Sequence, residues 1–277
     1  MPHFMTEDGV SIYYKETGEK GGRPVVGLHG WNSTHAMFDD LFSGMQEYRC
    51  ISLDFRGVNN SSLPKSRVTM GGLAADVKAL IEYLGLNDVV LIGYSMGASV
   101  LYKYIELFGT QHLYRTIICE MSPKLLNDEE WREGLGQGKE NPMENVLAAE
   151  KMFDDYPAFY REFVLKGNPA LAALPQKVFD SMLAGMLAPN TDYVLAAFYL
   201  SFLLQDYRPM LHKINVPTGI FFADPGSVYQ PKTAYYLAEK IPAKTKVVIF
   251  KGCTHLFGIE RPDLFLKEVR EFLGEDM

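Results

Sequence analysis

Residues 89–97 read Val-Val-Leu-Ile-Gly-Tyr-Ser-Met-Gly and are the most informative part of the chain. The first four residues are apolar and three are β-branched, which predicts a strand buried on both faces. A Gly-x-Ser-x-Gly turn follows, and residues 98–108 form a helical pattern that Gly109 can end. A strand, a sharp turn and a helix would hold Ser95 in a strained conformation with its hydroxyl exposed above the sheet edge. We therefore expect Ser95 to be a nucleophile rather than an ordinary turn serine.

Similar apolar runs recur on both sides of this stretch and alternate with helical patterns. Thr69 can cap one such helix and Gly85 can end it. This alternation predicts the α/β class, with a mostly parallel central sheet flanked by helices. The other expected strands are 10–15, which would lie at the outside, then 24–28, 49–53, 116–119, 218–223 and 246–250, and the late helices are 232–240 and 263–273.

The alternation stops between residues 124 and 208. This segment has a helical character and is rich in Met, Phe and Tyr. We expect residues 1–123 and 209–277 to form the α/β core, and residues 124–208 to form an inserted helical cap over the sheet edge. Most of its apolar side chains would pack the helices together, and some would line a pocket.

Composition limits the possible partners and surroundings. The 277 residues are 47% hydrophobic and carry a formal net charge of −7, which argues against nucleic acid or an anionic membrane surface as partner. The first residues lack a signal pattern, and no apolar stretch approaches membrane-spanning length. Cys50, Cys119 and Cys253 are widely spaced and lack metal-ligand spacing. We expect a cytoplasmic protein with buried free thiols and without a metal or organic cofactor.

Two further loops carry candidate site residues. The sequence His29-Gly30-Trp31 follows a buried strand, where a loop can turn its N–H groups toward a reacting carbonyl. We expect the backbone N–H groups of Trp31 and Met96 to form an oxyanion hole, His29 to make structural hydrogen bonds, and the Trp31 side chain to form a pocket wall. His255 lies in a loop between the last strand and the last helix, which suits a general base.

With Ser95, a later acid and His255 in that order, nearly the whole chain resembles the α/β-hydrolase family, and most closely its esterase-like and cofactor-free haloperoxidase-like branch with a helical cap. Where the family usually has His-Gly after the Arg-Gly pair, this chain has Val58-Asn59, and Asn59 still tolerates a left-handed backbone. We expect Asp54 and Arg56 to fix this turn by pairing with each other or with the backbone. The resemblance rests on residues 29–31, 54–57, 93–97 and 254–255.

The position of the acid departs from the usual family pattern. The family's usual acid lies beyond the sixth central strand, and counting back from Pro231 places Ser227 in that position. Asp224 comes too early and suits a turn-former beside Pro225. Some family members carry the acid one strand earlier, where Glu120 stands, and a carboxylate there can orient the histidine. The resemblance therefore favours Glu120 over Asp224 as the triad acid.

The resemblance implies acyl chemistry on a small apolar ester, thioester or lactone through a Ser95 acyl-enzyme. A serine nucleophile argues against dehalogenase or epoxide hydrolase chemistry in this fold, because those reactions need an alkyl-carboxylate intermediate. Two alternatives stay open: a non-catalytic, receptor-like protein that encloses a ligand beneath the cap, and an acyltransferase or perhydrolase that uses the same residues. The sequence does not indicate the oligomeric state.

Overall fold

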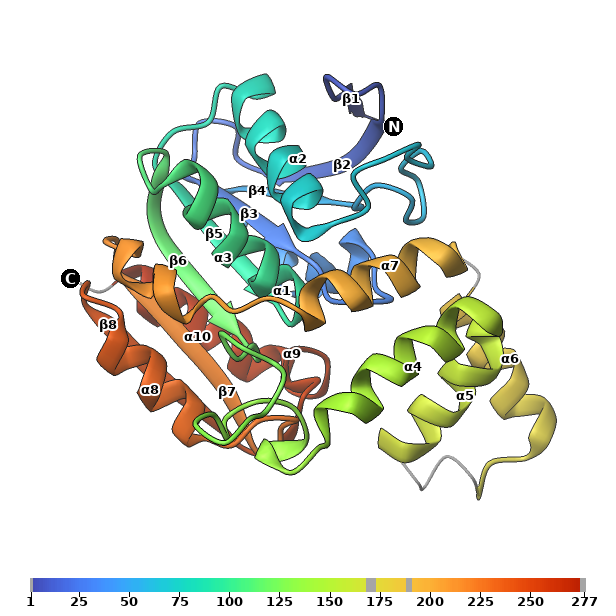
Figure 1. The fold of residues 1–277 in the computed structure, drawn as a ribbon. Helices are drawn as coiled ribbons and strands as arrows, with labels where there is room; N and C mark the ends of the chain where they lie inside the picture. Colours follow the sequence, from blue (N-terminus) through green and yellow to red (C-terminus); the bar gives the residue numbers. More distant parts are fainter. Residues whose placement is uncertain (1, 168–172, 188–190, 275–277) are drawn as a thin grey trace.

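A twisted, mostly parallel β-sheet forms the centre of the protein (Figure 1). The computed structural model describes residues 2–167, 173–187 and 191–274. Within these residues the sheet has eight strands in the order β1-β2-β4-β3-β5-β6-β7-β8. The strands are β1 (His3–Met5), β2 (Ser11–Gly18), β3 (Pro24–Leu28), β4 (Arg49–Leu53), β5 (Val89–Tyr94), β6 (Leu113–Cys119), β7 (Thr218–Gly226) and β8 (Thr245–Thr254).

Helices cover both faces of the sheet, which confirms the predicted α/β class. Figure 1 shows α2, α3 and α8 on one face and α1 and α10 on the other. The α-helices are α1 (Asp39–Ser43), α2 (Met70–Tyr83), α3 (Met96–Phe108), α4 (Pro142–Asp154), α5 (Tyr156–Gly167), α6 (Gln176–Leu187), α7 (Asp192–Leu203), α8 (Lys232–Lys240), α9 (Phe257–Glu260) and α10 (Pro262–Gly274), and the short 3₁₀ helices are η1 (His35–Phe38), η2 (Gly136–Gly138) and η4 (Arg208–Lys213).

Strand β5 shows how the sheet joins the two layers of the core. Val89 and Leu91 point into the core layer that contains the buried faces of α2, α3 and α8. Val90 and Ile92 point into the opposite layer, against α1, α9 and α10. All four side chains are fully buried, as the continuous apolar run predicted.

The register of the parallel strands places their carboxyl ends side by side. Tyr94 at the end of β5 pairs with Cys119 at the end of β6. Cys119 in turn pairs with Phe221 of β7. The residues that follow β5 and β6, Ser95 and Glu120, therefore emerge next to each other at one edge of the sheet.

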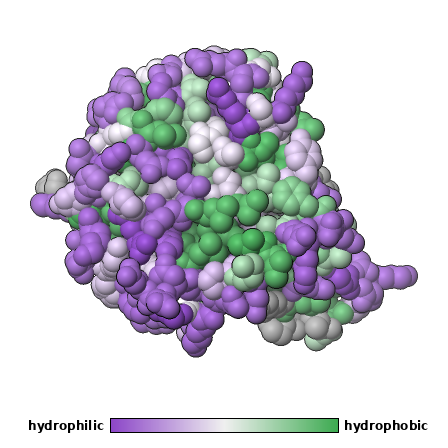
Figure 2. Space-filling view, in the orientation of Figure 1, coloured by the Kyte–Doolittle hydropathy of each residue, from purple (hydrophilic) through white to green (hydrophobic). Residues whose placement is uncertain are grey.

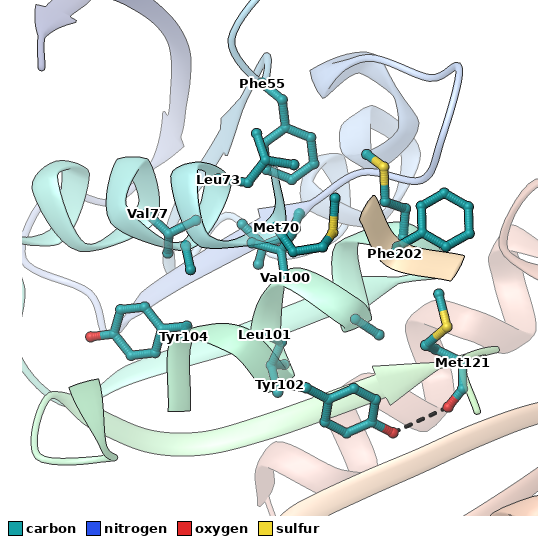
Figure 3. Close-up of a cluster of buried hydrophobic side chains, with 14 of the residues drawn as sticks. Phe55, Met70, Leu73, Val77, Val100, Leu101, Tyr102, Tyr104, Met121 and Phe202 are labelled. Atoms are coloured by element: carbon teal, nitrogen blue, oxygen red, sulfur yellow. Dashed lines mark hydrogen bonds between the residues drawn. The ribbon is translucent and has the colours of Figure 1, made fainter. Parts of the chain in front are cut away.

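Helices α4 to α7 lie beyond this edge, in the segment where the α/β alternation stops (Figure 1). Helix α7 is joined to the core, because the Met70 N–H at the start of α2 donates to Ser201 Oγ at 2.9 Å. Figure 3 shows Phe202 of α7 beside Met70 and Leu73 of α2 in the buried cluster, with the Tyr102 hydroxyl donating to the Met121 carbonyl below them.

The other helices of this segment pack mainly on one another. Helix α4 contacts both α5 and α7. Figure 2 shows apolar surface gathered over α4 and α7, and exposed apolar side chains of this region include Met143, Leu147 and Leu204. Residues 168–172 and 188–190 of the predicted cap lie outside the described residues.

Contacts with the backbone help to fix the turn after β4, which confirms one of the two expected arrangements. Asp54 and Arg56 do not pair with each other: Asp54 accepts from the His35 N–H and from His35 Nδ1, both at 2.8 Å. Arg56 is bound by Asp76 of α2 and by Asp8. A buried guanidinium has more donors than one carboxylate can accept from, so it recruits partners from distant elements. Asn59 does take the left-handed conformation, with φ of 47°.

The outermost strand β1 and the end of strand β7 differ most from the sequence expectation. The short strand β1 was not predicted, and it pairs antiparallel with β2. The turn predicted around Asp224 is wrong, because β7 continues through Gly226 and Asp224 pairs with Lys251 of β8. Hydrogen bonds to β8 satisfy the backbone of residues 224–226, although Pro225 and Gly226 had suggested a turn there.

The three cysteines are free and buried, as predicted. In the described parts of the chain, no helix is long and apolar enough to cross a membrane.

Candidate active site

Ser95 occupies the sharp turn between β5 and α3. Its backbone has φ of 53° and ψ of −122°, a combination that non-glycine residues rarely adopt, as the sequence predicted. The turn is possible because its two glycines carry no side chains. A Cβ at Gly93 would lie 2.5 Å from Ala98 Cα, and one at Gly97 would collide with the carbonyl oxygen of Leu28. Ser95 itself is partly exposed.

Three side chains from separate parts of the sheet edge form a continuous hydrogen-bonded row. His255 follows β8 directly, and its Nε2 lies 3.0 Å from Ser95 Oγ. The other ring nitrogen, Nδ1, lies 2.8 Å from Glu120 Oε2. Because an ionised carboxylate only accepts, Nδ1 carries the proton toward Glu120 and Nε2 is left to accept from the serine. The arrangement matches the geometry required of a nucleophile, a base and an orienting acid.

Glu120 is fully buried and its carboxylate is fixed on both oxygens. The Ala223 N–H donates to Oε1 at 2.5 Å, and the Ser227 hydroxyl donates to Oε2 at 2.7 Å. The backbone of Glu120 is left-handed, with φ of 52°, and its N–H donates to Phe221 O at 2.9 Å. This strained turn at the end of β6 directs the side chain toward His255.

Asp224, the alternative acid, is engaged elsewhere. Its carboxylate forms an ion pair with Lys251 of the neighbouring strand β8. The hydrogen bond to His255 Nδ1 comes from Glu120. Of the two candidate acids, the structure brings only Glu120 to the histidine.

The backbone around His255 is held by contacts that the sequence analysis missed. The Tyr94 hydroxyl donates to the His255 carbonyl at 2.8 Å, and the His255 N–H donates to Gly226 O at 3.0 Å. The side chain of Glu260 accepts from both the N–H and the hydroxyl of Thr254. Tyr94 precedes the predicted nucleophile in the sequence, which was the one local signal that could have identified it. These hydrogen bonds fix the loop that carries the His255 imidazole.

The loop after β3 lies against the nucleophile. A Cβ at Gly30 would lie 3.4 Å from Ser95 Cβ, which is ordinary van der Waals contact, so the backbone of this loop passes close to the nucleophile. Trp31 comes next in the loop, and Met96 is the first residue of α3, where a backbone N–H has no acceptor within the helix. The two predicted oxyanion donors are thus the backbone neighbours of Gly30 and Ser95.

His29 makes the structural hydrogen bonds expected of it. Burial lowers the pKa of His29 to about 4, so its ring is neutral near pH 7. Its Nδ1 donates to Gly30 O at 2.8 Å, and its Nε2 accepts from the Phe55 N–H at 3.2 Å. His29 thereby joins the loop after β3 to the turn after β4.

The Trp31 side chain joins the same loop to the helical segment. Its indole Nε1–H donates to the Leu195 carbonyl of α7 at 2.9 Å. Aromatic rings of α5 and α7 surround the indole, with centroids 5.6 to 6.0 Å away. We call these rings, together with Trp31, the aromatic cluster; its other members are Tyr156, Tyr160, Phe163 and Tyr199.

Comparison with known proteins identifies the family of this chain. The family model described as alpha/beta hydrolase fold matches residues 23–262. The chain therefore belongs to the α/β-hydrolase fold family. It is 24% identical to a non-heme chloroperoxidase of Kitasatospora aureofaciens, an alignment that covers 99% of this chain and 100% of that protein.

Two further relatives span the whole chain. A bifunctional esterase/perhydrolase of Acinetobacter calcoaceticus is 23% identical over 99% of both chains. The crystal structure of a bromoperoxidase from Bacillus anthracis superposes with a TM-score of 0.85 at 26% identity, covering 99% of this chain and 100% of that one. In the part of the chain that the structure describes, no group of three or more His, Cys, Asp or Glu side chains is arranged to hold a metal ion.

Proposed function

We propose that this protein is a serine hydrolase that cleaves a small carboxylic ester, thioester or lactone through an acyl-enzyme on Ser95. The observation that carries the proposal is the unbroken row Glu120–His255–Ser95, with contacts of 2.8 and 3.0 Å. A row in which each group orients the next supports a catalyst over the receptor-like alternative. Turnover of a short-chain p-nitrophenyl ester, lost after treatment with a fluorophosphonate, is the experiment that tests it.

The acylation step follows from the roles of these atoms. Ser95 Oγ attacks the substrate carbonyl while His255 Nε2 takes the hydroxyl proton. Glu120 holds the histidine tautomer and stabilises the imidazolium. The N–H groups of Trp31 and Met96 donate to the oxyanion of the tetrahedral intermediate. His255 then gives the proton to the leaving group as the carbon–oxygen or carbon–sulfur bond breaks, leaving the acyl group on Ser95.

The second step decides between hydrolysis and its alternatives. Water, deprotonated by His255, attacks the acyl-enzyme and releases the acid. Hydrogen peroxide in place of water would give a peracid with the same residues, and an alcohol acceptor would give acyl transfer. The name of the Acinetobacter relative, a bifunctional esterase/perhydrolase, favours perhydrolysis as a second activity. Adding peroxide to the ester assay and measuring peracid distinguishes these outcomes.

We further propose that residues 124–208 act as a cap that selects the substrate. The aromatic cluster contributes rings of α5 and α7 beside the loop that carries the proposed oxyanion donor. Aromatic side chains favour apolar groups and offer a carboxylate no compensating charge. The substrate class is therefore small and apolar.

Acyl-chain charge should decide which esters are turned over. We expect kcat/KM for p-nitrophenyl butyrate to exceed that for the p-nitrophenyl half-ester of a dicarboxylic acid by about tenfold or more, because a carboxylate beside the aromatic cluster would lose its hydration. The two rates are compared at one pH and ionic strength. A higher kcat/KM for the half-ester would contradict an apolar acyl site.

Trp31 should affect the rate of chemistry through its side chain as well as its backbone. In Trp31→Ala the indole anchor to Leu195 is lost, so the proposed N–H donor is less well placed, and we expect kcat to fall by about ten- to a hundredfold. Trp31→Phe retains ring packing and should lose less. Both kcat and the thermal midpoint are measured for each variant. Wild-type kcat in Trp31→Ala would show that the indole hydrogen bond to Leu195 of α7 does not help to position the proposed N–H donor.

A further inference from the structure

Ser227 lies beside the proposed triad without touching the nucleophile or the histidine. It follows β7 directly and is 6% exposed. Its hydroxyl donates to Glu120 Oε2 at 2.7 Å. The same carboxylate oxygen lies 2.8 Å from His255 Nδ1. Ser227 and His255 therefore share one oxygen of Glu120.

The direction of the Ser227 hydrogen bond is determined by its other neighbour. The Tyr229 N–H donates to Ser227 Oγ at 2.9 Å, so the serine oxygen already acts as an acceptor there. An ionised carboxylate has no proton to give. The hydroxyl proton of Ser227 must then point at Glu120, and the Tyr229 backbone holds it in that direction.

Glu120 depends on such donors because it is fully buried. Burying a carboxylate without hydrogen bonds has a high free-energy cost. A glutamate side chain also has several rotatable bonds, and these must be fixed before it can orient a histidine. The Ala223 N–H holds Oε1 at 2.5 Å, and Ser227 holds Oε2. Two donors on opposite oxygens fix the plane of the carboxylate.

We infer that Ser227 is a positioning residue for the proposed triad, acting on catalysis only through Glu120. This inference rests on the proposed function. Ser227 contributes a charge-assisted hydrogen bond to the Glu120 carboxylate. Removing one partner of such a bond changes the equilibrium constant of the process that depends on it by about ten- to a hundredfold. The expected effect is on kcat, because Ser227 acts on the base and contacts no substrate.

The direct test compares two buried serines near Glu120. Ser227→Ala is expected to lower kcat for p-nitrophenyl butyrate by about tenfold with KM within about twofold of wild type. Ser227→Thr keeps the hydroxyl and should recover most of the rate. Ser122→Ala is the matched control, since the buried Ser122 hydroxyl donates to the Lys124 carbonyl instead, at 2.8 Å, and its kcat should stay at the wild-type level.

A double-mutant cycle separates positioning from a general loss of stability. In the Glu120→Gln background, Ser227→Ala should lower kcat by less than about twofold, because the carboxylate that it positions is already gone. Thermal midpoints of all variants are measured so that assays are run where each is folded. A tenfold loss in both backgrounds, or wild-type kcat in Ser227→Ala alone, would overturn the inference.

Failure of this inference can be told apart from failure of the proposed function. If Ser95→Ala is inactive while Ser227→Ala turns over at the wild-type rate, only the role of Ser227 is lost. If Ser95→Ala retains wild-type esterase activity, the acyl-enzyme itself is wrong, and the role of Ser227 is overturned with it.

Discussion

Replacing Ser95 with alanine is expected to lower kcat for a short-chain p-nitrophenyl ester by at least about ten-thousandfold. The hydroxyl is the proposed attacking group, and His255 has no proton to take without it. Residual turnover would come from the oxyanion donors and from binding alone. The fold should persist, because alanine is no more strained than serine at φ of 53° and the hydrogen bond removed is the one between Ser95 Oγ and His255 Nε2.

Ser99→Ala provides a matched control for this substitution. Ser99 lies one turn further along α3, is fully buried, and its hydroxyl contacts the Tyr207 hydroxyl at 3.0 Å. We expect lower thermal stability with kcat close to wild type, since the residue does not touch the proposed triad. Wild-type ester turnover in Ser95→Ala would contradict the assignment of the nucleophile.

Glu120→Gln is expected to lower kcat by at least about a hundredfold with little change in KM. The amide has a similar size but no charge to stabilise the imidazolium, and its NH₂ group can donate to Nδ1 and so favour the wrong histidine tautomer. A comparable change in a serine protease triad costs about ten-thousandfold in kcat. Steady-state kinetics of the purified variant, with a thermal melt to confirm folding, measures the effect.

Asp224→Asn is the companion to Glu120→Gln. Asp224 pairs with Lys251 near the surface, where an ion pair is worth little, so its replacement should alter kcat by less than about threefold. The reverse ranking of the two variants would place the acid on β7 and contradict the role proposed for Glu120.

The positions that the sequence identified most clearly are those fixed by local pattern. The elbow at Ser95 needs only a buried strand, two glycines and a helix, all within one short stretch. His255 was identified by its place between the last strand and the last helix. The structural hydrogen bonds of His29 also agreed with the prediction made from its position at the start of a loop.

Other features depended on contacts between distant segments. The choice of Glu120 over Asp224 drew on a family resemblance, because nothing local shows that β6 and β7 are neighbours. Ala223 and Ser227 can hold the Glu120 carboxylate only because β6 and β7 are paired. The side-chain partners of Asp54 and Arg56 were not identified for the same reason, since His35, Asp8 and Asp76 are remote in sequence.

Strand ends were the least predictable part of the fold. The Pro and Gly after Asp224 suggested a turn, but pairing with β8 extends the strand through Gly226. The short helix α9 after His255 carries too few residues for a helical pattern to be recognised. Such boundaries depend on which neighbouring segment forms hydrogen bonds with the backbone N–H and C=O groups, and a single sequence does not show which segment that is.

The central claim is that Ser95 is the activated nucleophile, and fluorophosphonate labelling tests it most directly. The wild-type protein is treated with the reagent, assayed for loss of ester turnover, digested, and the modified peptide is located by mass spectrometry. Ser95→Ala and Ser99→Ala are treated in parallel. The account predicts one adduct on Ser95 in the wild type and in Ser99→Ala, loss of activity in proportion to labelling, and no adduct in Ser95→Ala. An adduct on another residue together with full activity in Ser95→Ala would contradict it.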